Sequence, residues 1–401
     1  MDTHQARATF VDFFRRRGHC EIAGSTLLPP PGDPVLFTSA GMHPLTAYLT
    51  GRPHPLGRRL AGVQRCLRTT DLDEIGDNTH LTLFQMLGSW SLGDYDGPQS
   101  QRWGLELLCD HFGLQPELLY ATAFGGNAQV GPDLEAAQTW SELGMPVELL
   151  GDDDNWWSNG PTGPCGPDSE IFAWTGSGPP EGTPGTDDRW LELWNHVTMR
   201  YERHPDGGLT PLAHPSVDTG MGLERLLMVA QDVPSVFDTD MFVPWKSALA
   251  PLWPAGQGPE EVRSLRIVID HLRASVVVIG DGVRPSNGGR GYVLRRLIRR
   301  ALIRLWRANP DSPLTFADVP LDVLRTTSEQ FGQQAPPEHA RAVLLNEEGR
   351  FRLLLTRGQE LLRRLYPAGV LSEDDYRFLY DTHGLPRELV TDVLARLGAG
   401  G

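Results

Sequence analysis

The chain is poor in lysine and cysteine. It contains one lysine, Lys246, so any cation that contacts a ligand in the first 245 residues must be an arginine or a histidine. The four cysteines are scattered and lack the paired spacing of a zinc site or a disulfide framework: Cys20, Cys66, Cys109 and Cys165. We therefore expect no zinc, and thiols that stay reduced in the cytoplasm.

Long hydrophobic runs are missing as well. No apolar stretch approaches the ~20 residues that span a bilayer. The residues from Met1 to Arg17 include acids and arginines, unlike the apolar segment of a signal peptide. These absences predict a cytoplasmic protein without membrane partners. The formal net charge of −15 argues against indiscriminate nucleic-acid binding, because an acidic surface repels phosphate.

The remaining composition is that of an ordinary globular protein, with 40% hydrophobic and 22% charged residues. Strand-like pieces such as Val35–Thr38 alternate with helical patterns in the first part of the chain. From Leu265 onward the periodicity is helical. We predict an α+β domain over residues 1–243 and a mostly helical domain over residues 244–401.

Glycines and charges gather in the segment Val217–Arg225 (VDTGMGLER). Gly220 and Gly222 let a backbone approach a ligand closely. Asp218 is placed to accept an ammonium group, and Arg225 offers a flat cation for a phosphate or a purine. The alternative is a glycine-rich turn that enters a helix with a solvated Glu–Arg pair, and this segment alone does not decide between the two.

A second segment, Val63–Arg68, is typical of a strand that ends in arginine. Arg65 and Arg68 are three residues apart, so a regular strand points them to opposite faces and only one can meet a given ligand. A returning strand would bring Arg68 beside His80 and Phe84. The arginine could then hold a phosphate while the ring stacks on a purine. An ordinary hairpin with a core phenylalanine is the alternative.

Taken together, these segments resemble the class II aminoacyl-tRNA synthetases. Arg68 with the His80–Phe84 spacing is similar to their motif 2, and residues 220–225 are similar to motif 3. The alanyl-tRNA synthetase family is the closer match, through collinear segments over essentially the whole chain: Phe10–Phe14, Ser39–Met42, Met86–Tyr95, Thr162–Pro167, Trp194–Asn195, Pro285–Asn287, Arg290–Arg296 and Leu379–Pro386. The resemblance implies an antiparallel sheet flanked by helices, followed by a helical domain that recognises tRNA.

The resemblance also implies roles for single residues. It implies ATP and Mg²⁺ as cofactors, with alanine and the acceptor stem of tRNA-Ala as partners. The catalytic residues would be Arg68 and Arg225. ATP would be bound by Arg68, His80, Phe84 and Arg225. Alanine would be bound by Met42, Arg68, Trp157, Val197, Asp218 and Gly220.

Glu192 and Asn195 resemble the magnesium position of class II synthetases, and a hard cation prefers such oxygen ligands. Their three-residue spacing puts them on opposite faces of a regular strand. Shared ligation would therefore require a β-bulge. Separate hydrogen bonds on the two faces are the alternative.

From Arg284 to Arg307 there are eight arginines and no acid. A solvated helix face is one interpretation, and a surface for the RNA backbone is the other. The resemblance implies that Asn287 and Asp381 read a G·U pair in the acceptor stem. Their alternatives are a turn asparagine and a helix N-cap aspartate. The arginines expected to bind tRNA are Arg290, Arg295, Arg296, Arg299 and Arg300.

The chain departs from the family's pattern in three ways. Ser39 stands where the family has an asparagine, and Asp168 stands where it has a second cysteine. The loop between Arg68 and His80 is shorter and lacks the Gly-Gly-Lys element, and no editing or C-terminal domain follows residue 401. We expect activation of alanine and its transfer to tRNA-Ala without editing in the same chain, with a possible factor that edits in trans. The alternatives are transfer of a small amino acid to a carrier protein or small molecule, and a non-catalytic tRNA-binding regulator.

Overall fold

The computed structural model describes residues 1–29, 35–70, 72–253, 258–308, 314–366, 371–385, 387 and 390–391. The chain divides into two compact units, Met1–Pro244 and Trp245–Gly401. In these described ranges, none of the helices combines the length and apolar character that crossing a bilayer requires.

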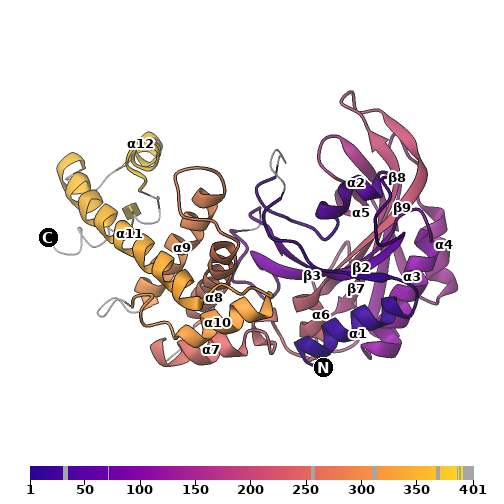
Figure 1. Ribbon diagram of the computed structural model, residues 1–401, viewed down its shortest axis with the longest axis horizontal. Coiled ribbons are helices and arrows are strands. Elements are labelled where there is room, and N and C mark those ends of the chain that lie inside the picture. The colour runs from indigo at the N-terminus through magenta and orange to yellow at the C-terminus, as the bar shows by residue number, and fades with distance from the viewer. Residues whose placement is uncertain are drawn as a thin grey trace. The chain divides into compact units, whose positions relative to one another are not determined.

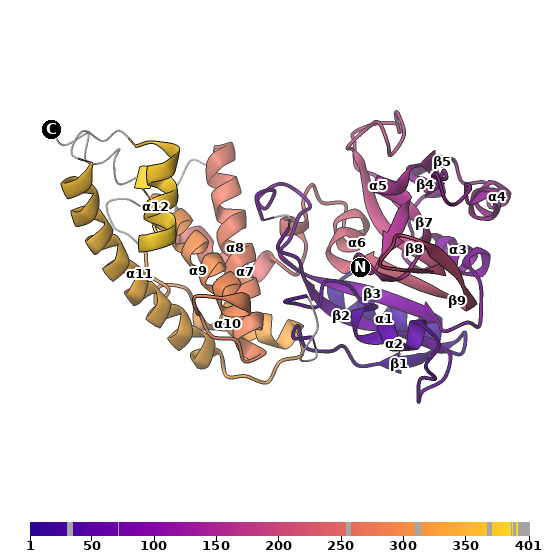
Figure 2. The same ribbon diagram turned by 90° about the horizontal axis from the view of Figure 1, so that it is seen from above.

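The first unit is built on one nine-stranded sheet (Figures 1 and 2). Its strands are β1 (Cys20–Ile22), β2 (Arg59–Leu67), β3 (Leu83–Ser91), β4 (Leu119–Phe124), β5 (Val147–Leu150), β6 (Trp156–Ser158), β7 (Gly163–Trp174), β8 (Trp190–Arg203) and β9 (Leu209–Gly222). The order is β1-β2-β3-β9-β8-β7-β4-β5, with β6 paired to β7. In this spatial order, all neighbouring pairs between β2 and β4 are antiparallel. The two edge pairs, β1 with β2 and β4 with β5, are parallel. The expected antiparallel sheet is thus confirmed, with parallel edges that the sequence did not predict.

One face of this sheet is covered by α1 (Thr3–Arg15), α3 (Gly97–Glu106) and α6 (Leu223–Ala230) (Figure 1). A capping box at Asp2 starts α1. The rings of Phe10 and Phe14 then lie 5.8 and 6.4 Å from the ring of Trp194 in β8. Aromatic packing therefore fixes α1 against the middle of the sheet. Val35–Thr38, expected as a strand, is wrong: these residues form a bend without strand pairing.

The opposite face of the sheet carries the segment from Met42 to Leu49, which includes α2 (Thr46–Leu49). The other helices of this unit are α4 (Leu134–Glu142) and α5 (Asp152–Asn155), and α7 (Val243–Leu249) spans the division between the units. Shorter helical turns lie at His43–Leu45, Leu107–His111, Pro116–Leu118, Val236–Asp238 and Ala250–Leu252.

The described part of the second unit is helical. Its helices are α8 (Pro259–Gly280), α9 (Gly289–Ala308), α10 (Leu321–Gln330), α11 (Pro337–Leu365) and α12 (Glu373–His383). Helix α8 packs against α9, α10 and α11. Nearly every residue from Ser264 to Ile279 is buried, including Asp270, His271 and Arg273. Such all-round burial identifies α8 as the central helix of this unit.

Candidate active site

A buried aspartate lies near the middle of the sheet face that α1 does not cover. Asp218 of β9 pairs with Trp90 of β3 on one side and Val197 of β8 on the other, so the three side chains share a face. Trp90 Nε1 donates a hydrogen bond to Asp218 Oδ1 at 2.6 Å. Burial raises the pKa of Asp218 to about 7, although the Trp90 bond opposes the shift. Among the described residues Asp218 has no cationic partner, which is the arrangement expected of a carboxylate that receives an ammonium group.

Apolar side chains enclose the space around this aspartate. Met42, Trp90 and Val197 belong to one buried cluster, and Trp157 packs against it from β6. Met42 is 1% exposed and Val197 is 3% exposed, so both side chains are shielded from solvent. The structure therefore brings together three of the residues expected to bind alanine and places them beside Asp218.

Gly220 keeps this region open. It lies two residues from Asp218 on the same face of β9, opposite Asn195 of β8. A Cβ on Gly220 would approach the Sδ atom of Met86 to 2.6 Å, which is closer than side-chain atoms pack. Met86 Sδ also accepts a hydrogen bond from the backbone N–H of Gly41 at 3.1 Å. Met86 thus fills the floor of the site only because residue 220 has no side chain.

Next to this pocket is a hollow of about 590 Å³, which includes space open to solvent. Its walls contain Gly220, Glu192 and all four residues expected to bind ATP: Arg68, His80, Phe84 and Arg225. Gly220, which lines this hollow, lies two residues from Asp218 on the same face of β9.

Arg68 lies at the end of β2, where its Cζ is 5.1 Å from the centroid of the Phe84 ring. Its Nε donates to the backbone oxygen of Ser39 at 3.2 Å. Arg68 lines the hollow and Arg65 does not. This difference agrees with their three-residue spacing, which points two side chains of an extended chain to opposite faces. Contact of either arginine with a ligand stays a prediction.

His80 is held between two carboxylates. Its Nδ1 is 2.5 Å from Asp77 Oδ2, and its Nε2 is 3.1 Å from Glu74 Oε2. The hydrogen bond to Asp77 raises the pKa of His80, against the opposing effects of burial and of Arg225. Burial by itself would raise the pKa of Asp77, but hydrogen bonds from His80 and from the Thr79 backbone lower it to about 2. The carboxylates therefore favour the imidazolium form of His80.

Arg225 is oriented by Glu192. Its Nη1 donates to Glu192 Oε2 at 2.9 Å and to the Glu192 backbone oxygen at 3.1 Å. Helix α6, which carries Arg225, is tied to β3 because both oxygens of the buried Glu224 accept from the Gln85 backbone N–H. The guanidinium is thus held in the wall of the hollow before any ligand binds.

A β-bulge decides the geometry of the predicted magnesium position. In the pairing of β7 with β8, Ile171 is opposite Trp194 but Phe172 is opposite Glu192, so Leu193 is the extra residue. The bulge removes the alternation of a regular strand, and Glu192 and Asn195 are both half-buried while Leu193 and Trp194 are buried.

The surroundings of Asn195 are acidic. Its Nδ2 donates to Asp168 Oδ2 at 3.0 Å and to Glu170 Oε1 at 3.1 Å. Burial raises the pKa of Asp168 to about 7 and that of Glu170 well above its usual range, and Glu192 adds to both shifts. Asn195 Oδ1 is buried and accepts no hydrogen bond. Oxygen ligands and an unpaired amide oxygen fit a hard cation. However, no group of three or more His, Cys, Asp or Glu residues is arranged to hold a metal within the described ranges.

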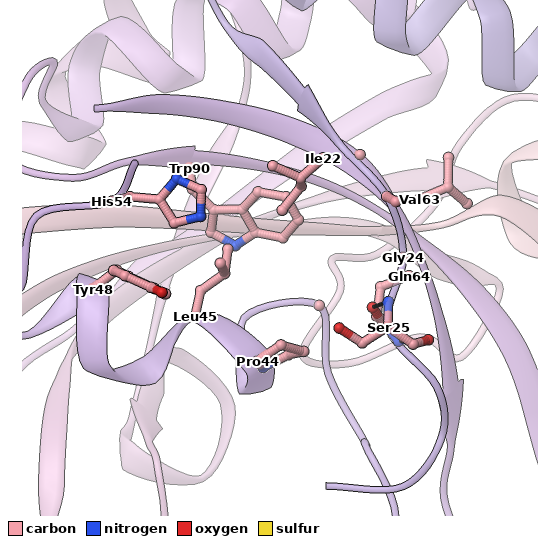
Figure 3. A pocket seen from close by; sticks show the side chains of 13 residues that line it. Ile22, Gly24, Ser25, Pro44, Leu45, Tyr48, His54, Val63, Gln64 and Trp90 are labelled. Carbon is pink, nitrogen blue, oxygen red and sulfur yellow. Dashed lines mark hydrogen bonds between the residues drawn. The ribbon is translucent and has the colours of Figure 1, made fainter. Parts of the chain in front are cut away.

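Another hollow lies near the β1 edge of the sheet. Figure 3 shows Trp90 and Leu45 on one side of it, and Gly24, Ser25 and Gln64 on the other. It contains none of the residues predicted from the sequence. Trp90 lines this hollow, and its Nε1 also donates a hydrogen bond to Asp218.

The chain as a whole matches known proteins. The family model described as "tRNA synthetases class II (A)" matches residues 5–400. The chain belongs to the class II aminoacyl-tRNA synthetases. An alanine–tRNA ligase of Treponema pallidum (strain Nichols) is 40% identical, over 98% of this chain and 68% of that protein. An alanine–tRNA ligase of Halorhodospira halophila (strain DSM 244 / SL1) is 42% identical, over 98% of this chain but only 46% of that protein.

Among solved structures, that of S. aureus histidyl-tRNA synthetase aligns with 59% of this chain and 68% of that chain. The sequence identity is 12% and the TM-score is 0.36. Membership of the synthetase family rests on the family model and on the sequence relatives.

In the helical unit of this synthetase, the residues expected to contact RNA differ in their surroundings. Arg295 Nη1 donates to Asn287 Oδ1, which joins two of them. Arg296 is exposed on α9. Arg299, in contrast, is only 16% exposed and its Nη2 is 2.7 Å from Oε1 of the buried Glu347. An ion pair of this kind is typical of a structural role.

The two residues expected to read the wobble pair are both exposed. Asn287 lies in the bend directly before α9. Asp381 lies in the last turn of α12, whose N-cap is Ser372, so the alternative of a helix N-cap aspartate is wrong. Arg290, at the start of α9, and Arg300 are half-buried.

Sequence reasoning missed several residues that organise the candidate site. Trp90 binds Asp218 across two strands, Asp77 binds His80 within the loop, and Glu224 ties α6 to β3. Asp77 carries a readable signal, since an Asp followed by Asn-Thr is typical of a turn stabilised by its own carboxylate. Trp90 carried no such signal, because only strand pairing places it opposite Asp218.

Proposed function

We propose that the chain activates L-alanine with ATP, which gives alanyl-adenylate and pyrophosphate, and then transfers the alanyl group to tRNA-Ala. The observation that carries this proposal is the buried Asp218, which has no cationic partner among the described residues and lies beside apolar side chains. It shares a face of β9 with Gly220, which lines the hollow around Arg68 and Arg225. The names of the relatives support the same chemistry, since they are alanine–tRNA ligases.

The residues around the pocket suit the first step. Asp218 would hold the alanine ammonium group, and the walls formed by Met42, Trp157 and Val197 would accept a methyl group but no large side chain. An oxygen of the alanine carboxylate attacks the α-phosphorus of ATP in line, and the bond from that phosphorus to the pyrophosphate oxygen breaks. Arg68 would stabilise the negative charge that develops on the α-phosphate.

Adenine would lie against Phe84, with Arg225 on its other face. Stacking and a cation–π contact act on the two faces of the adenine ring, so they position the base without hydrogen bonds to its edges. Arg68 now rests against the same phenylalanine ring. Binding of the nucleotide would therefore exchange the Arg68–Phe84 contact for contacts of Arg68 with phosphate and carboxylate.

Magnesium bound with the nucleotide would take Glu192 and the unpaired Oδ1 of Asn195 as ligands. It would supply positive charge that neutralises the phosphates. Because Glu192 also orients Arg225, the chain's own contribution is to hold the guanidinium and the oxygen ligands in one wall of the hollow.

For the second step we propose that residues 1–243 form the aminoacylation domain and residues 244–401 the domain that recognises the acceptor stem. The helical unit from Trp245 holds 22 of the 36 Lys and Arg residues against 18 of the 51 Asp and Glu, so it is basic within an acidic chain. A basic surface suits the RNA backbone, and the exposed Asn287 and Asp381 suit base edges.

Walls formed by Met42, Trp157 and Val197 would exclude large amino acids by contact but would discriminate poorly against glycine and serine. A difference of one small group is worth only ~1–3 kcal/mol. We therefore propose that a separate factor hydrolyses mischarged tRNA.

Two assays test the proposal. Exchange of labelled pyrophosphate into ATP should require alanine, should proceed without tRNA and should be lost in Asp218→Ala. Charging of transcribed tRNA-Ala should fall when its acceptor G·U pair is replaced by G·C. If exchange occurs but tRNA is not charged, a carrier protein or a small molecule would be the favoured acceptor. If no small amino acid supports exchange, the proposal that the chain activates an amino acid would be refuted.

A further inference from the structure

The nucleotide hollow must accommodate the outer phosphates of ATP without a lysine. The first unit ends at Pro244 and the single lysine of the chain is Lys246. Arg68 and Arg225 are assigned above to the α-phosphate and the base. The third basic side chain in the wall of the hollow is His80, which binds phosphate strongly only when it is protonated.

The loop that carries His80 is built by Asp77. One oxygen of this aspartate, Oδ1, accepts from the backbone N–H groups of Thr79 at 2.9 Å and His80 at 2.8 Å. The other oxygen, Oδ2, is 2.5 Å from His80 Nδ1. A single carboxylate therefore fixes both the backbone of the loop and the orientation of the ring.

The second ring nitrogen faces an exchangeable partner. Glu74 Oε2 is 3.1 Å from His80 Nε2, and the Glu74 side chain is 60% exposed. An exposed ion pair is weak, because water screens it and holding the two side chains costs entropy. A phosphate oxygen in the hollow can therefore replace Glu74 at Nε2, while Asp77 keeps its three hydrogen bonds. The charged groups that face His80 are Asp77, Glu74 and Arg225, and the arginine opposes its protonation.

We infer that Asp77 is the positioning residue that keeps His80 as an imidazolium for the outer phosphates of the nucleotide, and that ATP affinity in this chain therefore depends on pH. This inference rests on the proposed function in one respect, the placement of a nucleotide triphosphate in the hollow. The protonated ring takes the place of a permanent cation. ATP should bind tightly while His80 is protonated and more weakly as the pH rises above the raised pKa of His80.

The decisive measurement is the dissociation constant of ATP, and separately of AMP, for the full chain by titration calorimetry between pH 6 and 9. Three proteins are compared: the wild type, Asp77→Asn and His80→Lys. Asparagine keeps an oxygen for the two backbone N–H groups but removes the charge. Lysine stays protonated over this range because its usual pKa is about 10.4.

For the wild type we expect ATP affinity to fall several-fold over this range, and AMP affinity to stay constant because AMP has no outer phosphates. In Asp77→Asn the loss for ATP should begin at lower pH, near the ordinary histidine pKa of about 6.5. In His80→Lys the loss of ATP affinity with rising pH should disappear. Unchanged AMP binding in Asp77→Asn would show that the loop has kept its fold.

Equal pH profiles for the wild type and Asp77→Asn, or an unchanged profile in His80→Lys, would overturn the inference. So would a dependence that AMP shares with ATP, or no ATP binding at any pH. Pyrophosphate exchange distinguishes failure of this inference from failure of the proposed function. If exchange occurs and its dependence on ATP does not change with pH, only the inference is refuted. If ATP binding depends on pH but no exchange occurs, only the proposed function is refuted.

Discussion

Replacing Asp218 by asparagine should stabilise the protein while it destroys the proposed amino-acid site. Asp218 is 7% exposed and has no cation beside it among the described residues, and its pKa rises from 3.8 to about 7 because of burial. A difference of about three pKa units corresponds to ~4 kcal/mol between the folded and unfolded states. The folded protein bears this cost only when the carboxyl group is ionised.

The sign of the effect follows from the two pKa values. Below about pH 4 the carboxyl group is protonated in both states, so it costs nothing. As the pH rises towards 7, the unfolded chain ionises freely while the folded chain resists, and the stability of the wild type falls relative to a neutral side chain. Asparagine keeps an oxygen that can accept the Trp90 hydrogen bond. Asp218→Asn should therefore be more stable than the wild type by up to ~4 kcal/mol above pH 7, and equal to it near pH 4.

Urea unfolding followed by tryptophan fluorescence at several pH values measures this difference directly. Val197→Ala is a matched control, because it alters the same pocket without changing its charge and should shift stability equally at every pH. An Asp218→Asn protein that is less stable above pH 7, or whose difference from the wild type does not vary with pH, would contradict the assignment of Asp218 as a buried, unpaired carboxylate.

Three further outcomes are expected. The kcat/KM for alanine in pyrophosphate exchange should fall as the pH drops below about 7, because protonated Asp218 cannot hold an ammonium group; a profile that is flat between pH 6 and 8 would contradict this. Arg299→Ala should lower the free energy of unfolding by about 3–5 kcal/mol, since it leaves a buried glutamate unpaired, whereas exposed Arg296→Ala should leave stability unchanged and weaken tRNA binding in a filter assay. Gly220→Ala should raise the KM for alanine at least tenfold, because the new methyl group displaces Met86 into the pocket, and its thermal stability should change far less than its activity.

The site could be predicted from the sequence where its chemistry is local. Arg68, His80, Phe84 and Arg225 all line one hollow, as their spacing and the family resemblance predicted. The helical periodicity from Leu265 onward also located the helices of the second unit, for example α9. Local geometry decides such features, because the pitch of a helix and the alternation of a strand are the same in every protein.

The β-bulge at Leu193 could not be predicted in this way. A regular β8 separates Glu192 from Asn195, and the extra residue that changes their relation arises from the register of β8 against β7. Register is a property of two strands that are distant in sequence, so the pattern of either strand alone leaves it open.

The sequence by itself determined which residue types are present for the chemistry and in what order: an aspartate just ahead of two glycines, arginines in place of lysine, and glycines where a backbone must come close. Only the tertiary structure decided their state. It buried Asp218 against Trp90, paired Arg299 with Glu347 in the helical unit, and placed carboxylates at both nitrogens of His80. Burial and charge pairing depend on groups that folding brings together. They set the pKa values of Asp218 and His80, and they decide that Arg299 is engaged in an ion pair.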